Sequence, residues 1–200
     1  MLQLNSSHYV GKGLHRVCYV HPDQPRLCVK VVVNGNNQET KREYDYYQHL
    51  QKRNIDWTML PQFYGETPTD QGNAGVFDLI RDYNGEVSKT LASYLSSNDI
   101  SEQEASAICE AFMTLKSYLL DNRIVTMTIK PKNILFQKSS ATSGKLVIVD
   151  NIGNSDFIPI ANYLTFFAHR KIMRKWRHFE TNILSAYKDS LISQKIALSR

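Results

Sequence analysis

The sequence has few cysteines and no long apolar run, and both shortages narrow the class of protein. Cys18, Cys28 and Cys109 are odd in number and lack the spacing of metal ligands. They are expected to be free thiols in a reducing cytoplasm. No apolar run approaches the length that crosses a bilayer. Residues 1–7 are too short and polar to be the hydrophobic region of a secretory signal peptide. These absences favour a cytoplasmic protein without a membrane span.

The composition is that of an ordinary globular protein. Of the 200 residues, 42% are hydrophobic and 22% are charged. A chain of this length suffices for one domain, or for two small lobes that share a cleft. The formal net charge of +5 is compatible with an anionic ligand but does not identify one.

Residues 126–150 are the stretch around which the rest of the chain is organised. Residues 134–136 and 146–149 are apolar runs typical of strands. Residues 138–144 are rich in Ser, Thr and Gly, and they predict a turn between the two strands. The stretch is therefore expected to form a two-stranded ribbon.

Three polar side chains are expected to meet at one end of this ribbon. Lys130 and Asn133 precede the first strand, and Asp150 follows the second. Such a set can hold a phosphate chain through a divalent metal, because Mg²⁺ prefers oxygen ligands and is usually shared with substrate phosphates. Taken singly, Asn133 is equally a turn amide and Asp150 a strand-end cap.

Two apolar runs near the N-terminus predict a hairpin. Residues 9–20 end in V-C-Y-V, and residues 27–33 form a β-branched run. Gly11 and Gly13 lie near the start, where glycines let backbone amides approach phosphate oxygens. Two glycines near a hairpin are more often plain turn residues. Arg16 either contacts a phosphate or stiffens this loop, and the sequence does not decide which.

Lys30 lies among apolar residues of a predicted central strand. Burying a lysine is unfavourable unless it is paired, so an outward-facing position is the better interpretation of Lys30 taken alone. Residues 39–53 have helical spacing, which places Glu43 on the apolar face of a helix. We therefore expect Glu43 to point inward and to pair with Lys30, with Glu39 as the alternative partner.

Two helices are predicted in the C-terminal half. Residues 101–121 begin with a capping-box pattern and carry a continuous apolar stripe. Residues 163–191 predict a helix or a helix pair. Its expected core residues are Phe166, Phe167, Ile172, Trp176, Phe179, Ile183 and Leu184.

The second of these segments also carries a basic cluster. Its members are His169, Arg170, Lys171, Arg174, Lys175, Arg177 and His178. A solvated helix face is favoured over a surface for nucleic acid, acidic lipid or an acidic partner. The expected partners are a nucleotide and a protein that meets this basic helix, whereas nucleic acid is disfavoured.

Several motifs resemble those of protein kinases. The run I-K-P-K-N-I-L resembles the kinase catalytic loop, and the ribbon that ends in V-D resembles the approach to the metal-binding aspartate. The pattern G-K-G-L-H-R resembles the glycine-rich loop, with Arg16 in place of a third glycine. The chain as a whole resembles the bacterial YrbL family, known as PhoP regulatory network proteins and described as protein-kinase-like.

This resemblance implies an α+β, protein-kinase-like fold of two lobes. Residues 1–82 would form an N-terminal lobe with an antiparallel sheet and one helix, and residues 83–200 a minimal helical lobe. Only fifty residues follow Asp150, and no A-P-E signature occurs among them. The helical lobe is therefore expected to be truncated and to lack the platform for a protein substrate.

The resemblance also implies ATP and Mg²⁺ as cofactors. Lys30 would grip the α- and β-phosphates, and Glu43 would orient Lys30. Lys130 would neutralise the γ-phosphate, while Asn133 and Asp150 would hold the metal.

A hinge between the lobes is implied at the run G-V-F-D-L-I-R-D-Y-N-G. Phe77 would guard the back of an adenine pocket, and the backbone from Asp78 to Ile80 would bond the base. An ordinary core strand followed by a turn explains the same pattern.

One departure from the kinase pattern concerns the chemistry. Thr126, Met127 and Thr128 stand where kinases carry His-Arg-Asp. Thr128 cannot act as a base near neutral pH, and a positioned base contributes on the order of 10²–10⁴ in rate. Slow transfer is not forbidden, because most phosphoryl-transfer catalysis is positioning and charge neutralisation.

Three functions therefore stay open at this stage. The first is an ATP- and Mg²⁺-binding pseudokinase or regulator, linked by resemblance to the PhoP regulatory network. The second is an active but atypical phosphotransferase, acting on a small molecule or on itself. The third is a partner-binding module whose nucleotide cleft is vestigial.

Overall fold

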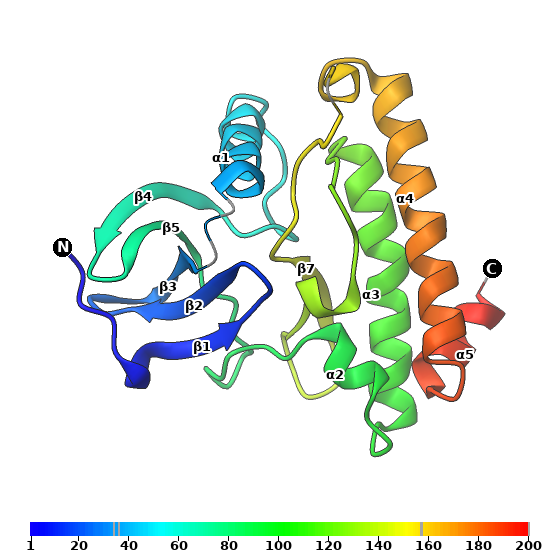
Figure 1. Cartoon of the computed structure of the whole chain (residues 1–200). Coiled ribbons are helices and arrows are strands. Elements are labelled where there is room, and N and C mark those ends of the chain that lie inside the picture. The colour runs from blue at the N-terminus through cyan, green and yellow to red at the C-terminus, as the bar shows by residue number, and fades with distance from the viewer. Residues whose placement is uncertain (34, 36, 157, 200) are drawn as a thin grey trace. The chain divides into compact units, whose positions relative to one another are not determined.

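The chain divides into two compact units in a computed structural model that describes residues 1–33, 35, 37–156 and 158–199. Unit 1 comprises residues 1–57 and 61–80, and unit 2 comprises residues 58–60 and 81–200. In Figure 1, residues 1–80 run from blue to blue-green, and residues 81–200 run from green to red.

Unit 1 is built on a five-stranded antiparallel sheet with the strand order β1-β2-β3-β5-β4. Its strands are β1 (Tyr9–Lys12), β2 (Arg16–His21), β3 (Gln24–Val32), β4 (Phe63–Thr69) and β5 (Gly72–Asp78), preceded by the short 3₁₀ helix η1 (Ser6–His8). The long apolar run lies in β3, at the centre of the sheet. The run at 9–20 is broken into β1 and β2 by a turn that starts at Gly13, so the chain forms two successive hairpins rather than one.

The sheet of unit 1 buries side chains on both faces. One face carries an aliphatic cluster that includes Val29 and Val31. The other packs against the helix α1 (Asn37–Gln51) through aromatic rings. The rings of Tyr47 and Phe63 lie 5.4 Å and 5.0 Å from that of Phe77. Helix α1 begins and ends two residues before the predicted bounds, so its apolar spacing was read correctly.

Gly75 on β5 allows the close approach of α1 to the sheet. A Cβ atom at this position would collide with the hydroxyl of Tyr44 and would lie 2.9 Å from the Phe77 ring. The absence of a side chain at residue 75 therefore lets two aromatic residues pack directly over the strand.

Unit 2 combines a two-stranded ribbon with helices. Its elements are α2 (Leu91–Leu95), α3 (Glu102–Asp121), η2 (Pro131–Asn133), β6 (Ile134–Lys138), β7 (Gly144–Ile148), η3 (Ile160–Asn162), α4 (Thr165–Ala186) and α5 (Leu191–Leu198). Helices α3 and α4 run side by side (Figure 1). The predicted ribbon, its turn and the α3 helix are thus present, and the C-terminal segment is a helix pair.

The core of unit 2 contains an aromatic cluster between α3 and α4. The Phe112 ring lies 4.6 Å from that of Trp176 and 5.6 Å from that of Phe179. The Ser101 hydroxyl accepts a hydrogen bond from the Glu104 amide at 3.1 Å, which caps the start of α3. None of the described helices combines the length and apolar character needed to cross a bilayer.

The predicted burial of two residues of α4 is wrong. Phe166 and Phe167 are 70% and 43% exposed, because they lie in the first turn of α4, before the part of the helix that faces α3. Ile172, Trp176, Phe179 and Ile183 are buried as predicted.

Candidate functional site

The end of the ribbon in unit 2 brings three of the predicted site residues together along the backbone. Ile134 pairs with Ile148 in the β6–β7 register, and the amide of Val149 donates to the Asn133 carbonyl at 2.9 Å. This bond places Asn133 beside the residue that precedes Asp150. The Asn133 amide in turn donates to the Lys130 carbonyl at 2.9 Å.

At this end of the ribbon, the Asn133 side chain is buried but lacks a hydrogen bond that its amide could make. It is 7% exposed, and its Nδ2 atom has no hydrogen-bond partner among the residues that the structure describes. Buried amide groups are nearly always hydrogen-bonded, and an exception requires an explanation. A bound ligand that contacts the Asn133 amide would explain this exception.

Asp150 and Lys130 complete this end of the ribbon. Asp150 is half-buried, and its Oδ1 atom accepts the amide of Asn151 at 2.9 Å. Asn151 has a φ of 62°, a left-handed conformation in which Asn is enriched among residues other than Gly. Lys130 is exposed.

The loop that carries Thr128 is fixed on two sides. The Met127 amide donates to the Asn151 carbonyl at 2.8 Å, and the Gly153 amide donates to the Val125 carbonyl at 3.0 Å. From helix α4, the Lys175 ammonium donates to the Met127 carbonyl at 2.7 Å. Burial lowers the pKa of Lys175, and the neighbouring charges of Lys171 and Arg174 lower it further.

This loop offers no carboxylate to act as a base. Thr128 is half-buried in it, and the sequence between Asp121 and Asp150 contains no Asp or Glu. Asp150 is therefore the first carboxylate after the α3 helix, and it lies on the metal side of the predicted site.

The basic cluster of α4 is split between two faces. Lys171 is buried, with its ammonium 2.7 Å from an oxygen of Asp156 and hydrogen-bonded to Asn154. Together with Lys175, Lys171 ties the segments on either side of Asp150 to the helix. The outward members are His169, Arg170, Arg174, Arg177 and His178.

Sequence reasoning missed the two inward lysines. They are four residues apart, and each lies next to a position of the buried stripe that contains Ile172 and Trp176. That spacing was the available signal.

In unit 1, Glu43 is buried as the helical spacing predicts, and the ion pair that the structure shows for it is with Arg16. The guanidinium Nη1 and the carboxylate Oε2 are 2.5 Å apart, with side chains 11% and 2% exposed. Lys30, also largely buried, has its ammonium 4.4 Å from the centre of the Phe77 ring. The pairing of Lys30 with Glu43 stays a prediction.

The two glycines of unit 1 lie in and after β1. Gly11 is opposite Cys18, and the Gly13 amide donates to the Arg16 carbonyl at 2.8 Å, which closes the first hairpin. A Cβ atom built on Gly11 would meet no atom of the described residues within 4 Å. The packing of the chain therefore does not require a glycine there, and the space above it is open to a ligand.

The predicted hinge residues are engaged within unit 1. Phe77 is fully buried. The Asp78 carboxylate accepts the Gln62 amide at 2.8 Å and the Tyr64 hydroxyl at 2.9 Å. Burial raises the pKa of Tyr64, and its bond to Asp78 raises it further.

The backbone of the same segment is also partly engaged. The amide of Asp78 donates to the Gln62 carbonyl at 3.2 Å, and the amide of Leu79 donates to Arg26 at 2.8 Å. For either amide to bond the adenine base, its present hydrogen bond would have to break. Half-buried Ile80 lies beyond both of these bonds in the chain.

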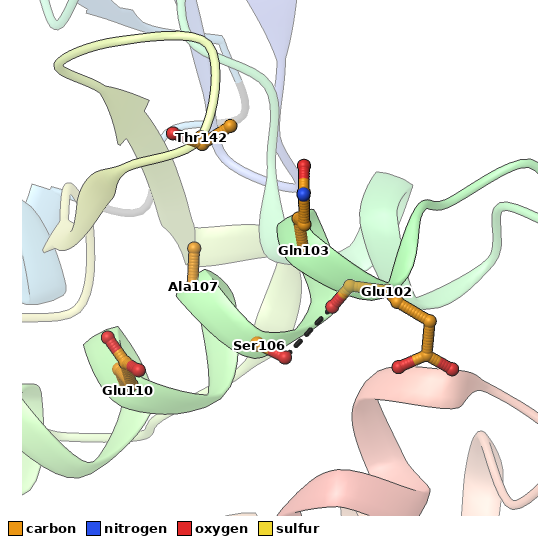
Figure 2. Close-up of a pocket in the computed structure, with 6 residues that line it drawn as sticks. All are labelled: Glu102, Gln103, Ser106, Ala107, Glu110 and Thr142. Atoms are coloured by element: carbon orange, nitrogen blue, oxygen red, sulfur yellow. Dashed lines mark hydrogen bonds between the residues drawn. The ribbon is translucent and has the colours of Figure 1, made fainter.

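A depression of about 460 Å³ lies beside the N-terminal half of α3 (Figure 2). Gln103, Ala107 and Glu110 follow one another along the helix, near Thr142 of the ribbon turn. Glu102 is 2.7 Å from the ammonium of Lys195. The lining includes none of the predicted site residues and no cation.

Comparisons with known proteins agree with this architecture. A family model described as "PhoP regulatory network protein YrbL" matches residues 2–184. The uncharacterized protein YrbL of Escherichia coli (strain K12) is 38% identical over 182 residues, which cover 90% of this chain and 86% of the relative. The relative from Shigella flexneri has the same identity and coverage.

A solved structure shows the fold. The crystal structure of Rad53 1–466 in complex with AMP-PNP matches with a TM-score of 0.56 at 15% identity. The match covers 96% of this chain and 51% of that one, so the chain spans about half the length of the solved structure. The α+β, protein-kinase-like fold is thereby confirmed, and the chain belongs to the YrbL family of PhoP regulatory network proteins.

Proposed function

We propose that this protein binds ATP with Mg²⁺ and works as a pseudokinase or regulator rather than as an efficient kinase. The observation that carries the proposal is the buried Asn133 amide, whose nitrogen lacks a partner among the described residues and whose backbone is bonded to Val149, the residue before Asp150. The loop before it has Thr128 where kinases have an aspartate.

Unit 2 carries the residues that we expect to bind the metal. The Asp150 carboxylate and the Asn133 amide oxygen are the kind of ligands that Mg²⁺ prefers. The two ends of an amide differ only by a half-turn of the side chain. Asn133 can therefore present its oxygen to a metal without rearrangement of η2. Exposed Lys130 would meet the γ-phosphate.

Unit 1 carries the residues that we expect to contact phosphate. The open space at Gly11 allows backbone amides to approach phosphate oxygens. The ammonium of Lys30 lies over an aromatic ring in a buried setting, where a phosphate would add a direct opposite charge. The ion pair with Glu43 favours stiffening of the loop as the role of Arg16.

The chemistry of the proposed site is binding and charge neutralisation. When bound, Mg²⁺ would offset the charge of the phosphates. Thr128 does not remove a proton from an acceptor hydroxyl near neutral pH. We therefore expect stable nucleotide binding with little or no phosphoryl transfer.

The setting of this activity is part of the proposal. Cys18, Cys28 and Cys109 form no disulfide in the described part of the chain, and we expect them to lie in a reducing cytoplasm. Family membership associates the protein with the PhoP regulatory network. A nucleotide-dependent regulator within that network is the function we infer.

Calorimetry with ATP, in the presence and absence of Mg²⁺, tests the proposal. We expect binding that Mg²⁺ strengthens and that Lys30→Met and Asp150→Asn each weaken about tenfold or more, because each removes a charged contact. Lys41→Met, an exposed lysine on α1, is the matched control and should bind as the wild type does. Absence of binding at millimolar nucleotide in a folded sample would remove the proposal in favour of a vestigial cleft.

Incubation with radiolabelled ATP separates the pseudokinase from the atypical phosphotransferase. The proposal predicts no label on the protein or on added small molecules above the background of an Asp150→Ala variant. If the wild type transferred label and the Asp150→Ala variant did not, the protein would be an active phosphotransferase instead.

A further inference from the structure

Exposed apolar side chains are concentrated in one short segment of unit 2. Fourteen large apolar side chains are exposed in the described part of the chain, and six of them fall within residues 158–167. These six, which we call the apolar tip, are Ile158, Ile160, Tyr163, Leu164, Phe166 and Phe167, each between 42% and 70% exposed. Exposed apolar residues scattered singly are ordinary, but a contiguous patch marks an interaction site.

The apolar tip projects because α4 begins beyond the end of α3. The His169 ring is 3.1 Å from the carbonyl of Leu120, in the last turn of α3. Arg123, just past that end, donates to the Thr165 hydroxyl at 3.1 Å. The first turn of α4 and the η3 segment before it therefore extend past α3, as Figure 1 shows.

A row of arginines continues from the apolar tip along α4. Arg170, Arg174 and Arg177 follow Phe166 at intervals of four, four and three residues, so all four lie on one face of the helix. All three arginines are exposed, and we call them the cationic face. The sequence from Ile158 to Phe179 contains no Asp or Glu.

We propose that the apolar tip and the cationic face together dock the protein on an anionic lipid surface. Apolar side chains at the end of a helix can enter the boundary between headgroups and acyl chains, while arginines beside them bind lipid phosphates. Tyr is enriched at membrane interfaces, and Phe and Leu are typical of the apolar face of helices that lie in them. The charge of the cationic face, with no carboxylate in the segment, is complementary to an acidic leaflet.

Two other occupants fit the same observations less well. Nucleic acid would use the arginines and aromatic rings, but the exposed Ile158, Ile160 and Leu164 have no stacking role on bases. A second copy of the chain would bring two cationic faces together, with like charges opposed. An acidic lipid surface uses both the aliphatic residues and the arginines.

Vesicle flotation tests the proposal with the full chain. The protein should float with vesicles of equal parts phosphatidylglycerol and phosphatidylcholine, and remain unbound with phosphatidylcholine alone. Raising the salt concentration should weaken the binding. The triple variant Arg170→Gln, Arg174→Gln, Arg177→Gln should lower the partition coefficient about a hundredfold, at about fivefold per charge.

The apolar tip is tested separately from the charge. Phe166→Ser should lower the partition coefficient about tenfold, because it removes one large apolar side chain from the interface. Leu198→Ser, which changes an 87% exposed leucine outside the tip, is the matched apolar control. Lys41→Gln with Arg42→Gln, both exposed on α1, is the charge control. Both controls should bind as the wild type does, and all variants should keep the wild-type circular dichroism spectrum.

Several outcomes would overturn the proposal. One is absence of flotation with the acidic vesicles, and another is flotation that neither the triple variant nor Phe166→Ser changes. A dimer in sedimentation velocity that Phe166→Ser converts to a monomer would assign the tip to a second copy of the chain. Tighter binding to a single-stranded oligonucleotide than to acidic vesicles, lost in the triple variant, would assign the surface to nucleic acid.

Discussion

A buried carboxylate of unit 1 and a buried amide of unit 2 differ in how far the described residues satisfy them. In unit 1, the Glu43 carboxylate is paired with Arg16. In unit 2, the buried Asn133 amide nitrogen has no partner among the described residues, although it lies at the end of a well-paired ribbon. Groups satisfied by their own unit are expected to support its fold, whereas a buried amide left without a partner points to a ligand.

The largest effect is expected when the buried ion pair of unit 1 is broken. Glu43→Ala leaves the Arg16 guanidinium buried without its partner carboxylate, and the free energy of unfolding should fall by about 3–5 kcal/mol. The double variant Arg16→Met, Glu43→Leu should recover most of this loss, because apolar residues of similar size often replace a buried pair without penalty. Urea unfolding measures both. A double variant no more stable than Glu43→Ala would show that the pair is not the source of the loss.

An alkaline loss of stability is expected from Tyr44 of unit 1. Burial raises the pKa of Tyr44 to about 12 from its usual 10, and Glu43 adds to this while Arg16 opposes it. Between these two pH values the unfolded chain releases the proton and the folded chain keeps it. Stability should therefore fall as pH rises from 10 towards 12, by on the order of 2 kcal/mol from this residue.

The contribution of Tyr44 is isolated by Tyr44→Phe, which removes the ionisable hydroxyl. Urea unfolding at pH 9 and pH 11 should show a smaller alkaline loss for this variant than for the wild type. Tyr83→Phe, at an exposed tyrosine of unit 2, should retain the full loss. Equal losses in the wild type and Tyr44→Phe would assign the effect to other groups.

A smaller effect on stability, but a large one on binding, is expected at Asn133 of unit 2. Asn133→Ala removes an amide whose nitrogen the described residues leave unbonded, so unfolding free energy should change by no more than about 1 kcal/mol. The strengthening of ATP binding by Mg²⁺ should disappear. Asn122→Ala removes an amide that donates to the Tyr118 carbonyl at 3.1 Å and should leave that strengthening intact. The assignment of Asn133 to ligand binding would be contradicted if Asn133→Ala greatly lowered the unfolding free energy while Mg²⁺ still strengthened ATP binding.

The smallest effect is expected from an ion pair at the surface. Lys195 lies 2.7 Å from Glu102, whose side chain is 72% exposed. Lys195→Ala should change the unfolding free energy by less than about 1 kcal/mol, because solvent screens such pairs. Thermal unfolding at low and high salt should show that even this difference fades with salt. A loss comparable to that of Glu43→Ala would remove the distinction between buried and exposed pairs.

The ribbon and the α3 helix could be predicted from the sequence because their signals are local. Apolar runs joined by a Ser- and Gly-rich turn determine the first, and a capping box with an apolar stripe determines the second. The pairing of Arg16 with Glu43 could not be predicted, because it depends on where the first hairpin turns. That turn at Gly13 places Arg16 at the start of β2.

The exposure of Phe166 and Phe167 could not be predicted from the apolar spacing of the sequence either. Helical spacing shows which residues share a face, but it does not show where a neighbouring helix ends. The contacts of Leu120 and Arg123 with α4 show that α3 stops just short of this turn. The roles of Lys30, Lys130 and the hinge residues in binding a nucleotide remain predictions.

Hydrogen–deuterium exchange with and without ATP and Mg²⁺ tests most directly whether the predicted nucleotide-binding residues of each unit respond to nucleotide. The account predicts slower exchange in two places at once, at residues 9–16 and 27–32 of unit 1 and at residues 126–135 and 147–153 of unit 2. Slower exchange in only one unit, or no change in either with nucleotide in excess, would contradict it.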